Sequence, residues 1–436
     1  MADTGCEKTR SRGEVIYGVG RRARGGPRRL CSAVCGCDSS DRHESEDIGT
    51  MISQFNVPST LVFGAGASRE LVPQLARIGA RRVLLVTDAF MVSSGLAGRF
   101  SRDLGEAGIA VALFAGVQAD PTDRNVGDGL AAYRKGGCDS VVALGGGSPI
   151  DAAKAIAVMT ANAGLLGEYQ GYHKVPRAGC PLVVIPTTAG TGSEVTKVAV
   201  ITDTGRNVKM MMLDRHLLPQ VALVDYELTL TMPPALTAHV GVDTLTHGIE
   251  AYVSRKATAL TDPLALTCIR LVAEHLEAAW REPANRAARE GMMLAATLGG
   301  MAFSNSSVAL VHGMSRPIGA IFHVPHGLSN AVLLPTATRF SLPGAPERYA
   351  TVARTMGLCA ADASAEAAGD SLVEGLAGLN ARLRVPRLRD CHGVERARFD
   401  SSVEKMAADA LASGSPQNNP VVPTAMEIIR LYGEAW

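Results

Sequence analysis

The chain has 436 residues, of which 47% are hydrophobic, and its 43 basic and 42 acidic side chains give a formal net charge of +1. This length exceeds one ordinary hydrophobic core, so we expect two domains. The near-neutral charge argues against a nucleic-acid binder, and no apolar run reaches the roughly 18 residues that a membrane-spanning helix needs.

The first 50 residues are rich in Arg, Gly, Ser and Asp and lack apolar periodicity, which predicts a disordered segment. Our preferred hypothesis is that Met51 is the natural start and that residues 1–50 are an artefact of an upstream start. A transit peptide is disfavoured because such peptides are poor in acidic residues. Five later cysteines occur singly in periodic segments, which indicates buried thiols and a cytoplasmic protein.

Residues 51–233 alternate between apolar strands and helical segments. Strands that are apolar on both faces and alternate with helices predict a parallel sheet covered on both sides. A hairpin near the edge of this sheet is predicted at residues 196–202 and 208–213. Residues 234–436 show almost only helical periodicity, so we place the boundary between an α/β domain and an all-α domain near residue 233. The expected strands are residues 60–63, 83–87, 111–114, 140–144, 182–185 and 221–224.

Three consecutive glycines, Gly145, Gly146 and Gly147, join a predicted strand to a predicted helix. Ser148 suits the N-cap position and Asp151 the third helical position, as in a capping box. Glycines let a pyrophosphate approach bare backbone, and the helix N-terminus offers free N–H groups. The stretch therefore predicts a dinucleotide phosphate site, with a purely structural strand–turn–helix as the alternative.

A second loop, residues 186–193, contributes the hydroxyls of Thr187, Thr188 and Thr191. It suits a second wall of the phosphate site, although a plain polar loop remains the alternative. Asp88 follows a strand and would accept hydrogen bonds from a ribose, which favours NAD over NADP. A helix cap is the alternative role for Asp88. The usual G-x-G-x-x-G fingerprint is absent, so the standard Rossmann arrangement is not expected.

A metal site is predicted from Asp243 and His247, which lie four residues apart and share one face of a predicted helix. His312 and His326 each precede a glycine, in a stretch whose Pro and Gly residues disfavour one straight helix. The chain is therefore expected to turn back and bring all four side chains together. One Asp and three His suit Fe(II) or Zn(II). The alternatives are a solvated Asp–His pair and structural histidines.

Taken together, these motifs resemble the iron-containing (group III) alcohol dehydrogenases, and within that family its lactaldehyde and 1,3-propanediol branch. The resemblance covers about residues 53–436. It implies an N-terminal α/β dinucleotide-binding domain, a C-terminal all-α metal-binding domain, and the dehydroquinate-synthase-like fold with the active site between them. The motifs that carry it are residues 145–151, 186–194, 241–250, 262–263, 301–305, 311–313 and 325–327.

The resemblance implies that Asp243, His247, His312 and His326 bind the metal and that Phe303 lies beside the substrate and the nicotinamide. It implies hydride transfer between NAD(H) and a small alcohol, diol or hydroxy acid, in a homodimer or larger homo-oligomer. A same-fold lyase or polyol-phosphate dehydrogenase, and a non-catalytic NAD- and metal-binding regulator, are the alternatives. The implied NAD-site positions are Asp88, Asp120, Gly146, Gly147, Asp151, Thr187, Thr191, Val200 and Lys209.

One position departs from the family pattern. Reductases of this family commonly carry a second His four residues after the third metal ligand, as a candidate proton relay, whereas this chain has Arg316. Arginine stays protonated and cannot be an ordinary proton acceptor. If Arg316 points into the cleft, we expect it to favour an acidic substrate end; a surface arginine in a salt bridge is the alternative.

Overall fold

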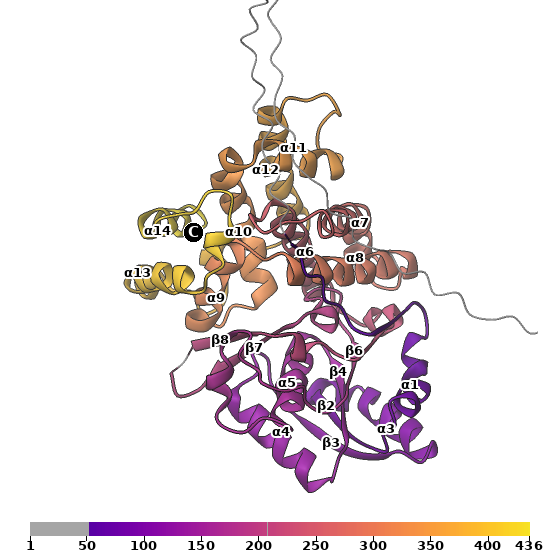
Figure 1. Cartoon of the computed structure of the whole chain (residues 1–436). Helices are drawn as coiled ribbons and strands as arrows, with labels where there is room; N and C mark the ends of the chain where they lie inside the picture. Colours follow the sequence, from indigo (N-terminus) through magenta and orange to yellow (C-terminus); the bar gives the residue numbers. More distant parts are fainter. Residues whose placement is uncertain (1–51, 207) are drawn as a thin grey trace, which may run out of the picture. The chain divides into compact units, whose positions relative to one another are not determined.

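The computed structural model describes residues 52–206 and 208–436, and residues Ser53–Trp436 form one compact unit. The predictions for residues 1–50 and for a start at Met51 therefore lie outside the described residues. Within the compact unit an α/β half comes first and a helical half follows (Figure 1).

Six parallel strands form the main sheet, in the order β1-β9-β6-β4-β2-β3. Neighbouring residues on each strand enter different cores: Val83 and Leu85 of β2 pack on one face, and Leu84 and Val86 on the other. Both faces are therefore buried, as the apolar runs predicted. The strands are β1 Thr60–Phe63, β2 Arg82–Asp88, β3 Ala110–Val117, β4 Ser140–Gly145, β6 Leu182–Pro186 and β9 Val221–Val224.

Helices cover both faces of the sheet (Figure 1). Ile150 and Ile156 of α5 share a core with Leu84, whereas Leu75 of α1 and Phe100 of α3 share the other. This arrangement confirms the predicted doubly covered α/β layer. The helices of this half are α1 Leu71–Arg77, α2 Ala89–Ser93, α3 Leu96–Glu106, α4 Asp123–Lys135 and α5 Gly147–Met159.

The order of the strands reverses between β2 and β4, because β3 pairs with one side of β2 and β4 with the other. In open parallel sheets ligands bind beyond the carboxyl ends of the strands at such a reversal. The chain places Asp88 at the end of β2 and the three glycines at the end of β4. The topology thus directs the predicted phosphate loop to a binding position.

The predicted hairpin is present, as β7 Val198–Asp203 paired antiparallel with β8 Val208–Leu213. It does not extend the main sheet. The second side of β8 pairs with the short strand β5, Gly171–Tyr172, so a separate three-stranded sheet forms. Side chains of β7 and β8 line one wall of the cavity described below.

The helical half begins at Pro234, a proline at the first position of its helix, where its missing N–H is not needed. The chain breaks between α9 and α10, where His323 adopts a left-handed conformation with φ of 58°. The helices are α6 Pro234–Val253, α7 Asp262–Arg281, α8 Arg286–Asn305, α9 Leu310–Phe322, α10 His326–Ser341, α11 Pro346–Thr355, α12 Ala365–Arg382, α13 Arg396–Ala412 and α14 Ala425–Glu434.

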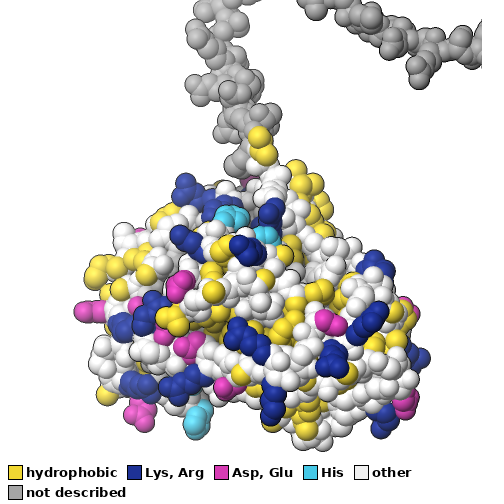
Figure 2. Space-filling view, turned by 60° about the horizontal axis from the view of Figure 1, so that its bottom comes forward, with side chains coloured by type: hydrophobic (Ala, Val, Ile, Leu, Met, Phe, Trp, Pro, Cys, Tyr) yellow, Lys and Arg dark blue, Asp and Glu magenta, His cyan; other side chains and the backbone are white. Residues whose placement is uncertain are grey.

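Among the described residues, no single helix is both long and apolar enough to cross a membrane; α8 and α9 would pass only as a pair, bent by 102°. On the surface shown in Figure 2, Lys and Arg side chains are distributed among acidic and apolar ones. This mixture agrees with the balanced charge of the sequence.

Candidate active site

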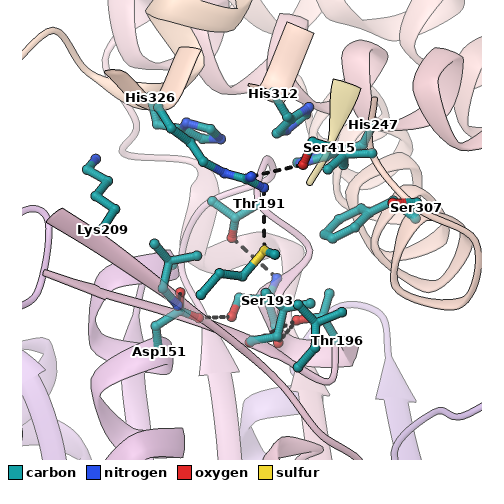
Figure 3. Close-up of a pocket in the computed structure, with 18 of the residues that line it drawn as sticks. Asp151, Thr191, Ser193, Thr196, Lys209, His247, Ser307, His312, His326 and Ser415 are labelled. Carbon is teal, nitrogen blue, oxygen red and sulfur yellow. Dashed lines mark hydrogen bonds between the residues drawn. The ribbon is translucent and has the colours of Figure 1, made fainter. Parts of the chain in front are cut away.

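One cavity lies between the two halves, and all four predicted metal ligands line it. Figure 3 labels His247, His312 and His326 at this cavity. Asp243 and His247 come from α6, His312 from α9 and His326 from the first residue of α10. The Oδ1 atom of Asp243 lies 3.8, 3.6 and 3.9 Å from the Nε2 atoms of His247, His312 and His326, respectively. The turn between α9 and α10 therefore brings together the side chains that the sequence analysis selected.

These spacings fit a bound cation. Ligand atoms about 2.1 Å from Zn(II) or a similar ion in a tetrahedron lie about 3.4 Å apart. The ligand atoms of Asp243, His247 and His312 all lie within 4.8 Å of one another and are buried. His326 stands outside this group, and its side chain is 36% exposed. Three ligand atoms are thus already convergent, and the fourth is at the cavity.

The protonation of the cluster also suits a metal. Burial lowers the pKa of His312 well below its usual value, helped by the neighbouring His247 and His326. Burial also lowers the pKa of His326 to about 4, against the opposing effect of Asp243. Burial alone would raise the pKa of Asp243, yet the three imidazoles lower it overall. At neutral pH Asp243 therefore offers a carboxylate, and His312 and His326 offer unprotonated imidazoles.

Glu250, which the sequence analysis did not single out, orients His312. Its Oε2 lies 2.6 Å from His312 Nδ1, and its Oε1 accepts a 2.6 Å bond from the N–H of Val311. When His312 Nδ1–H donates to this carboxylate, the lone pair of Nε2 faces the cavity, as a metal ligand requires. Glu250 lies seven residues after Asp243, two turns along the same face of α6, and that spacing was the available signal.

Asn330 is the second residue that the sequence analysis missed. Its Nδ2 lies 2.6 Å from Asp243 Oδ1 and 3.2 Å from the Nε2 atoms of both His312 and His326. An amide nitrogen has two hydrogens and cannot satisfy three acceptors. Three acceptors therefore converge on one electropositive atom, the environment that suits a cation. The spacing of four residues from His326 on α10 was the signal for this position.

Phe303, from α8, lines the cavity, and its predicted place beside the substrate and the nicotinamide stays a prediction. Its ring stacks on His247 with a centroid distance of 4.3 Å, and His247 in turn stacks on His312 at 4.7 Å. The Nδ1 atom of His247 has no hydrogen-bond partner among the described residues. The position of His247 is thus fixed by ring packing and its helix.

The predicted phosphate loop lies on the opposite wall, but its capping differs from the prediction. Helix α5 begins at Gly147 with Gly146 as N-cap, and no side chain caps it. Ser148 is therefore the second helical residue, not the N-cap. Asp151, one turn further in, accepts bonds from Ser193 Oγ at 2.5 Å and Val200 N at 2.9 Å. A helix N-terminus without a side-chain cap retains N–H groups for an anion.

The glycines also let the second predicted loop approach. A Cβ on Gly147 would lie 2.9 Å from Thr191 Cγ2, and one on Gly146 would lie 3.2 Å from Thr188 Oγ1. The N–H of Thr187 donates to Gly145 O at 2.9 Å. Two loops that are distant in the sequence thus pack together, so the glycines serve this contact as well as access to bare backbone.

The predicted cofactor residues divide into two groups. One group does not line the cavity: Asp88, Gly145, Gly146, Thr187 and Thr188. The Oδ1 of Asp88 accepts a bond from Met91 N and caps α2. The roles of both groups toward a dinucleotide stay predictions. The predicted cofactor residues that do line the cavity are Asp120, Gly147, Ser148, Asp151, Thr191, Val200 and Lys209.

Lys154 supports this wall from behind and was also missed. Its buried ammonium donates to Ser193 Oγ at 3.0 Å, Thr196 Oγ1 at 2.9 Å and Val198 O at 2.8 Å. Burial lowers its pKa to about 8, while Asp151 opposes that shift. The amine therefore ties α5 to the loop after β6 and to β7.

Arg316 lines the same cavity, so it is not the surface arginine of the alternative prediction. Its Nη1 donates to Ser415 Oγ at 2.9 Å, and its Nη2 lies 3.5 Å from Met211 Sδ. In Figure 3 these contacts are the dashed lines that end at the labelled Ser415 and at the sulfur atom.

Comparison with known proteins shows which family shares this architecture. Residues 58–226 match the family described as iron-containing alcohol dehydrogenase, and residues 237–436 match the C-terminal domain of the same family. The NAD-dependent methanol dehydrogenase of Bacillus methanolicus is 38% identical, over 88% of this chain and 100% of that protein. The lactaldehyde reductase of Escherichia coli is 36% identical over the same shares of the two chains.

The solved structure of a 1,3-propanediol oxidoreductase superposes with a TM-score of 0.85 at 36% identity, covering 88% of this chain and 100% of that one. The matches span both halves and include the segments that carry the convergent Asp and His side chains. This chain therefore belongs to the iron-containing alcohol dehydrogenase family.

Proposed function

We propose that the chain is an NAD-dependent, metal-dependent alcohol dehydrogenase or aldehyde reductase that acts on a small alcohol, diol or hydroxy acid. The observation that carries the proposal is one cavity with two unlike walls. One wall presents a carboxylate and three imidazoles, and the other presents a helix N-terminus without a side-chain cap. Relatives named for methanol, lactaldehyde and 1,3-propanediol support a small substrate.

We assign Asp243, His247, His312 and His326 as ligands of Fe(II), with Zn(II) as the alternative, because carboxylate and imidazole suit both ions. A cation bound there supplies Lewis-acid polarisation of the substrate oxygen, and NAD supplies the hydride acceptor. Glu250 holds His312 in the tautomer that offers Nε2 to the cation. Phe303 limits the orientations that a substrate carbon can take beside the nicotinamide.

The proton of the alcohol needs a separate route. Arg316 stands where the family's reductases commonly carry a His, and a guanidinium does not accept protons at working pH. We therefore assign proton transfer to the ribose hydroxyls of the dinucleotide and to water in the cavity. Thr191 and Ser193 are hydroxyl-bearing residues that line the same cavity.

Three finer assignments complete the proposal. NAD is favoured over NADP because Asp88, at the carboxyl end of β2, would repel a 2′-phosphate. We also propose a homodimer or a larger homo-oligomer, and a cytoplasmic location. Size-exclusion chromatography with light scattering tests the assembly, and a single-chain mass in solution would contradict it.

The function is tested with protein reconstituted separately with Fe(II) and Zn(II). A panel of alcohols and aldehydes is offered with NAD(H) and with NADP(H), and NADH absorbance is followed. We expect metal-dependent turnover of short alcohols with NAD. NAD binding without any alcohol-dependent absorbance change would indicate the non-catalytic regulator instead. Turnover confined to phosphorylated polyols would indicate the polyol-phosphate enzyme.

A further inference from the structure

Arg316 is a cation in the cavity wall that has no ion-pair partner among the described residues. Arg316 extends from α9, four residues after His312, so the two side chains share one face of the helix about 5–6 Å apart at Cβ. Within residues 52–206 and 208–436, no Asp or Glu oxygen lies within 4.0 Å of its guanidinium. A partly buried charge without a partner is costly, unless a ligand completes it.

The guanidinium also keeps donors free. It carries five N–H groups, and its contacts are one hydroxyl, Ser415 Oγ, and one weakly accepting sulfur, Met211 Sδ. Ser415 is itself buried, so this single strong bond holds the group in place from one side. The remaining N–H groups are available to an acceptor in the cavity.

The acids of the cavity are already engaged. Asp120 pairs with Lys209 at 2.7 Å, and Asp151 accepts from Ser193 and Val200. Asp243 belongs to the metal cluster. None of the three neutralises Arg316.

The cavity is also lined by a second cation that has no ion-pair partner in the described part of the chain, and by further hydroxyls. Lys256 lines the cavity with its Nζ 5.7 Å from the centroid of the Tyr172 ring, and no carboxylate among the described residues pairs with it. Ser306 and Ser307 line the same cavity from the end of α8 and just beyond it. The wall that carries the predicted phosphate loop lies across the cavity. Figure 3 labels Asp151, Thr191 and Ser193 there.

We propose that Arg316 binds the anionic end of the substrate, and that the chain prefers short alcohols and aldehydes bearing a carboxylate or sulfonate over neutral ones of the same size. The inference rests on the function proposed above and adds the substrate class. The spacing of one helical turn from His312 suits a substrate with a short carbon chain between its hydroxyl and its anion. A single guanidinium fits a singly charged anion in a bidentate contact.

The test compares each acid with its neutral amide. Protein reconstituted with Fe(II) is assayed with 3-hydroxypropanoate, 4-hydroxybutanoate, their amides, 2-hydroxyethanesulfonate and 1,3-propanediol. The proteins are the wild type, Arg316→Gln, Arg316→Lys and Arg396→Gln. The last removes a positive charge from an exposed pair with Asp400 on α13 and serves as the matched control.

For the wild type we expect kcat/KM for the acid to exceed that for its amide by about tenfold or more, as one hydrogen bond to a charged group produces. Arg316→Gln should reduce this ratio by about tenfold or more, Arg316→Lys should restore part of it, and Arg396→Gln should leave it unchanged. The KM for NAD should not move in any of them. Sulfonate activity that follows the same pattern supports a general monoanion site.

Two outcomes separate this inference from the proposed function. An equal ratio in wild type and Arg316→Gln, with 1,3-propanediol still oxidised, overturns the anion site and leaves the dehydrogenase assignment intact. If no alcohol is oxidised, the binding of propanoate and of propanamide to the metal-loaded protein is measured by calorimetry. Propanoate binding that is lost in Arg316→Gln supports the site, and equal binding in both proteins overturns it.

Discussion

Replacing Glu250 by Gln tests how the metal cluster is oriented. The carboxylate accepts two bonds of 2.6 Å, from Val311 N–H and from His312 Nδ1. Gln has one acceptor and one donor where Glu has two acceptors. If the amide oxygen stays with Val311, the NH₂ group faces His312 Nδ1 and forces that nitrogen to accept. The proton of the ring then resides on Nε2, which can no longer bind a cation.

The magnitude follows from this conflict. Metal binding requires the proton to return to Nδ1, where two donors then face each other in a buried site. Such an unsatisfied buried group costs about 1–3 kcal/mol, which corresponds to roughly 5- to 150-fold weaker metal affinity. The metal-free protein avoids the conflict by changing tautomer. Because burial raises the pKa of Glu250 to about 7, a neutral side chain should not lower the stability of the metal-free fold.

The assay is competition for Fe(II) or Zn(II) with a chelator of known affinity, alongside thermal unfolding of the metal-free proteins. Glu274→Gln, on the exposed face of α7 in a pair with Arg270, is the matched control. We expect weaker metal binding in Glu250→Gln alone, with unchanged unfolding of the metal-free form. Metal affinity within about twofold of the wild type, or an equal loss in Glu274→Gln, would refute the reasoning.

Four further substitutions have defined outcomes. Asp243→Ala and His326→Ala should each lose metal and activity together; elemental analysis beside turnover checks this, and full activity in a metal-free variant would contradict it. Lys154→Met leaves three buried acceptors without their donor, so we expect a rise in the KM for NAD and a loss of about 2–4 kcal/mol in urea unfolding, with unchanged metal content. Gly192→Ala adds a Cβ at φ of 60° and 2.6 Å from Gly300 Cα, so the free energy of unfolding should fall by about 2 kcal/mol or more. A stability equal to that of the wild type would show that the loop can move away.

The parts of the fold that the sequence predicted are those set by periodicity. Two-sided apolar strands such as residues 83–87 have only one stable placement, inside a sheet covered by helices. The metal ligands were also accessible, because Asp243 and His247 share a helix face and Pro and Gly residues break the chain before His326. In each case the local pattern and the tertiary arrangement agree.

The features that the sequence did not predict depend on contacts between residues that are distant in the sequence. Ser148 and Asp151 have the spacing of a capping box, but the helix starts at Gly147, and Asp151 bonds instead to Ser193 and Val200. Glu250 and Asn330 lie on ordinary helical segments and acquire their roles from side chains on other helices. No local pattern distinguishes them from helix residues that only pack.

The lack of an ion-pair partner for Arg316 among the described residues is another feature that the sequence could not predict. A sequence cannot tell an arginine in a surface salt bridge from one that faces a cavity without a counter-charge. The structure distinguishes them, because the acids lining the cavity already have partners.

The most direct test of the central claim is hydride transfer itself. Protein reconstituted with Fe(II) is mixed with NAD and 1,3-propanediol carrying deuterium on its hydroxyl-bearing carbons, and the NADH formed is analysed by mass spectrometry. We predict that the NADH carries one deuterium and that the metal-free protein forms none. NADH without deuterium, or NADH formed equally well by Asp243→Ala, would contradict a metal-dependent transfer of hydride from the alcohol carbon to NAD.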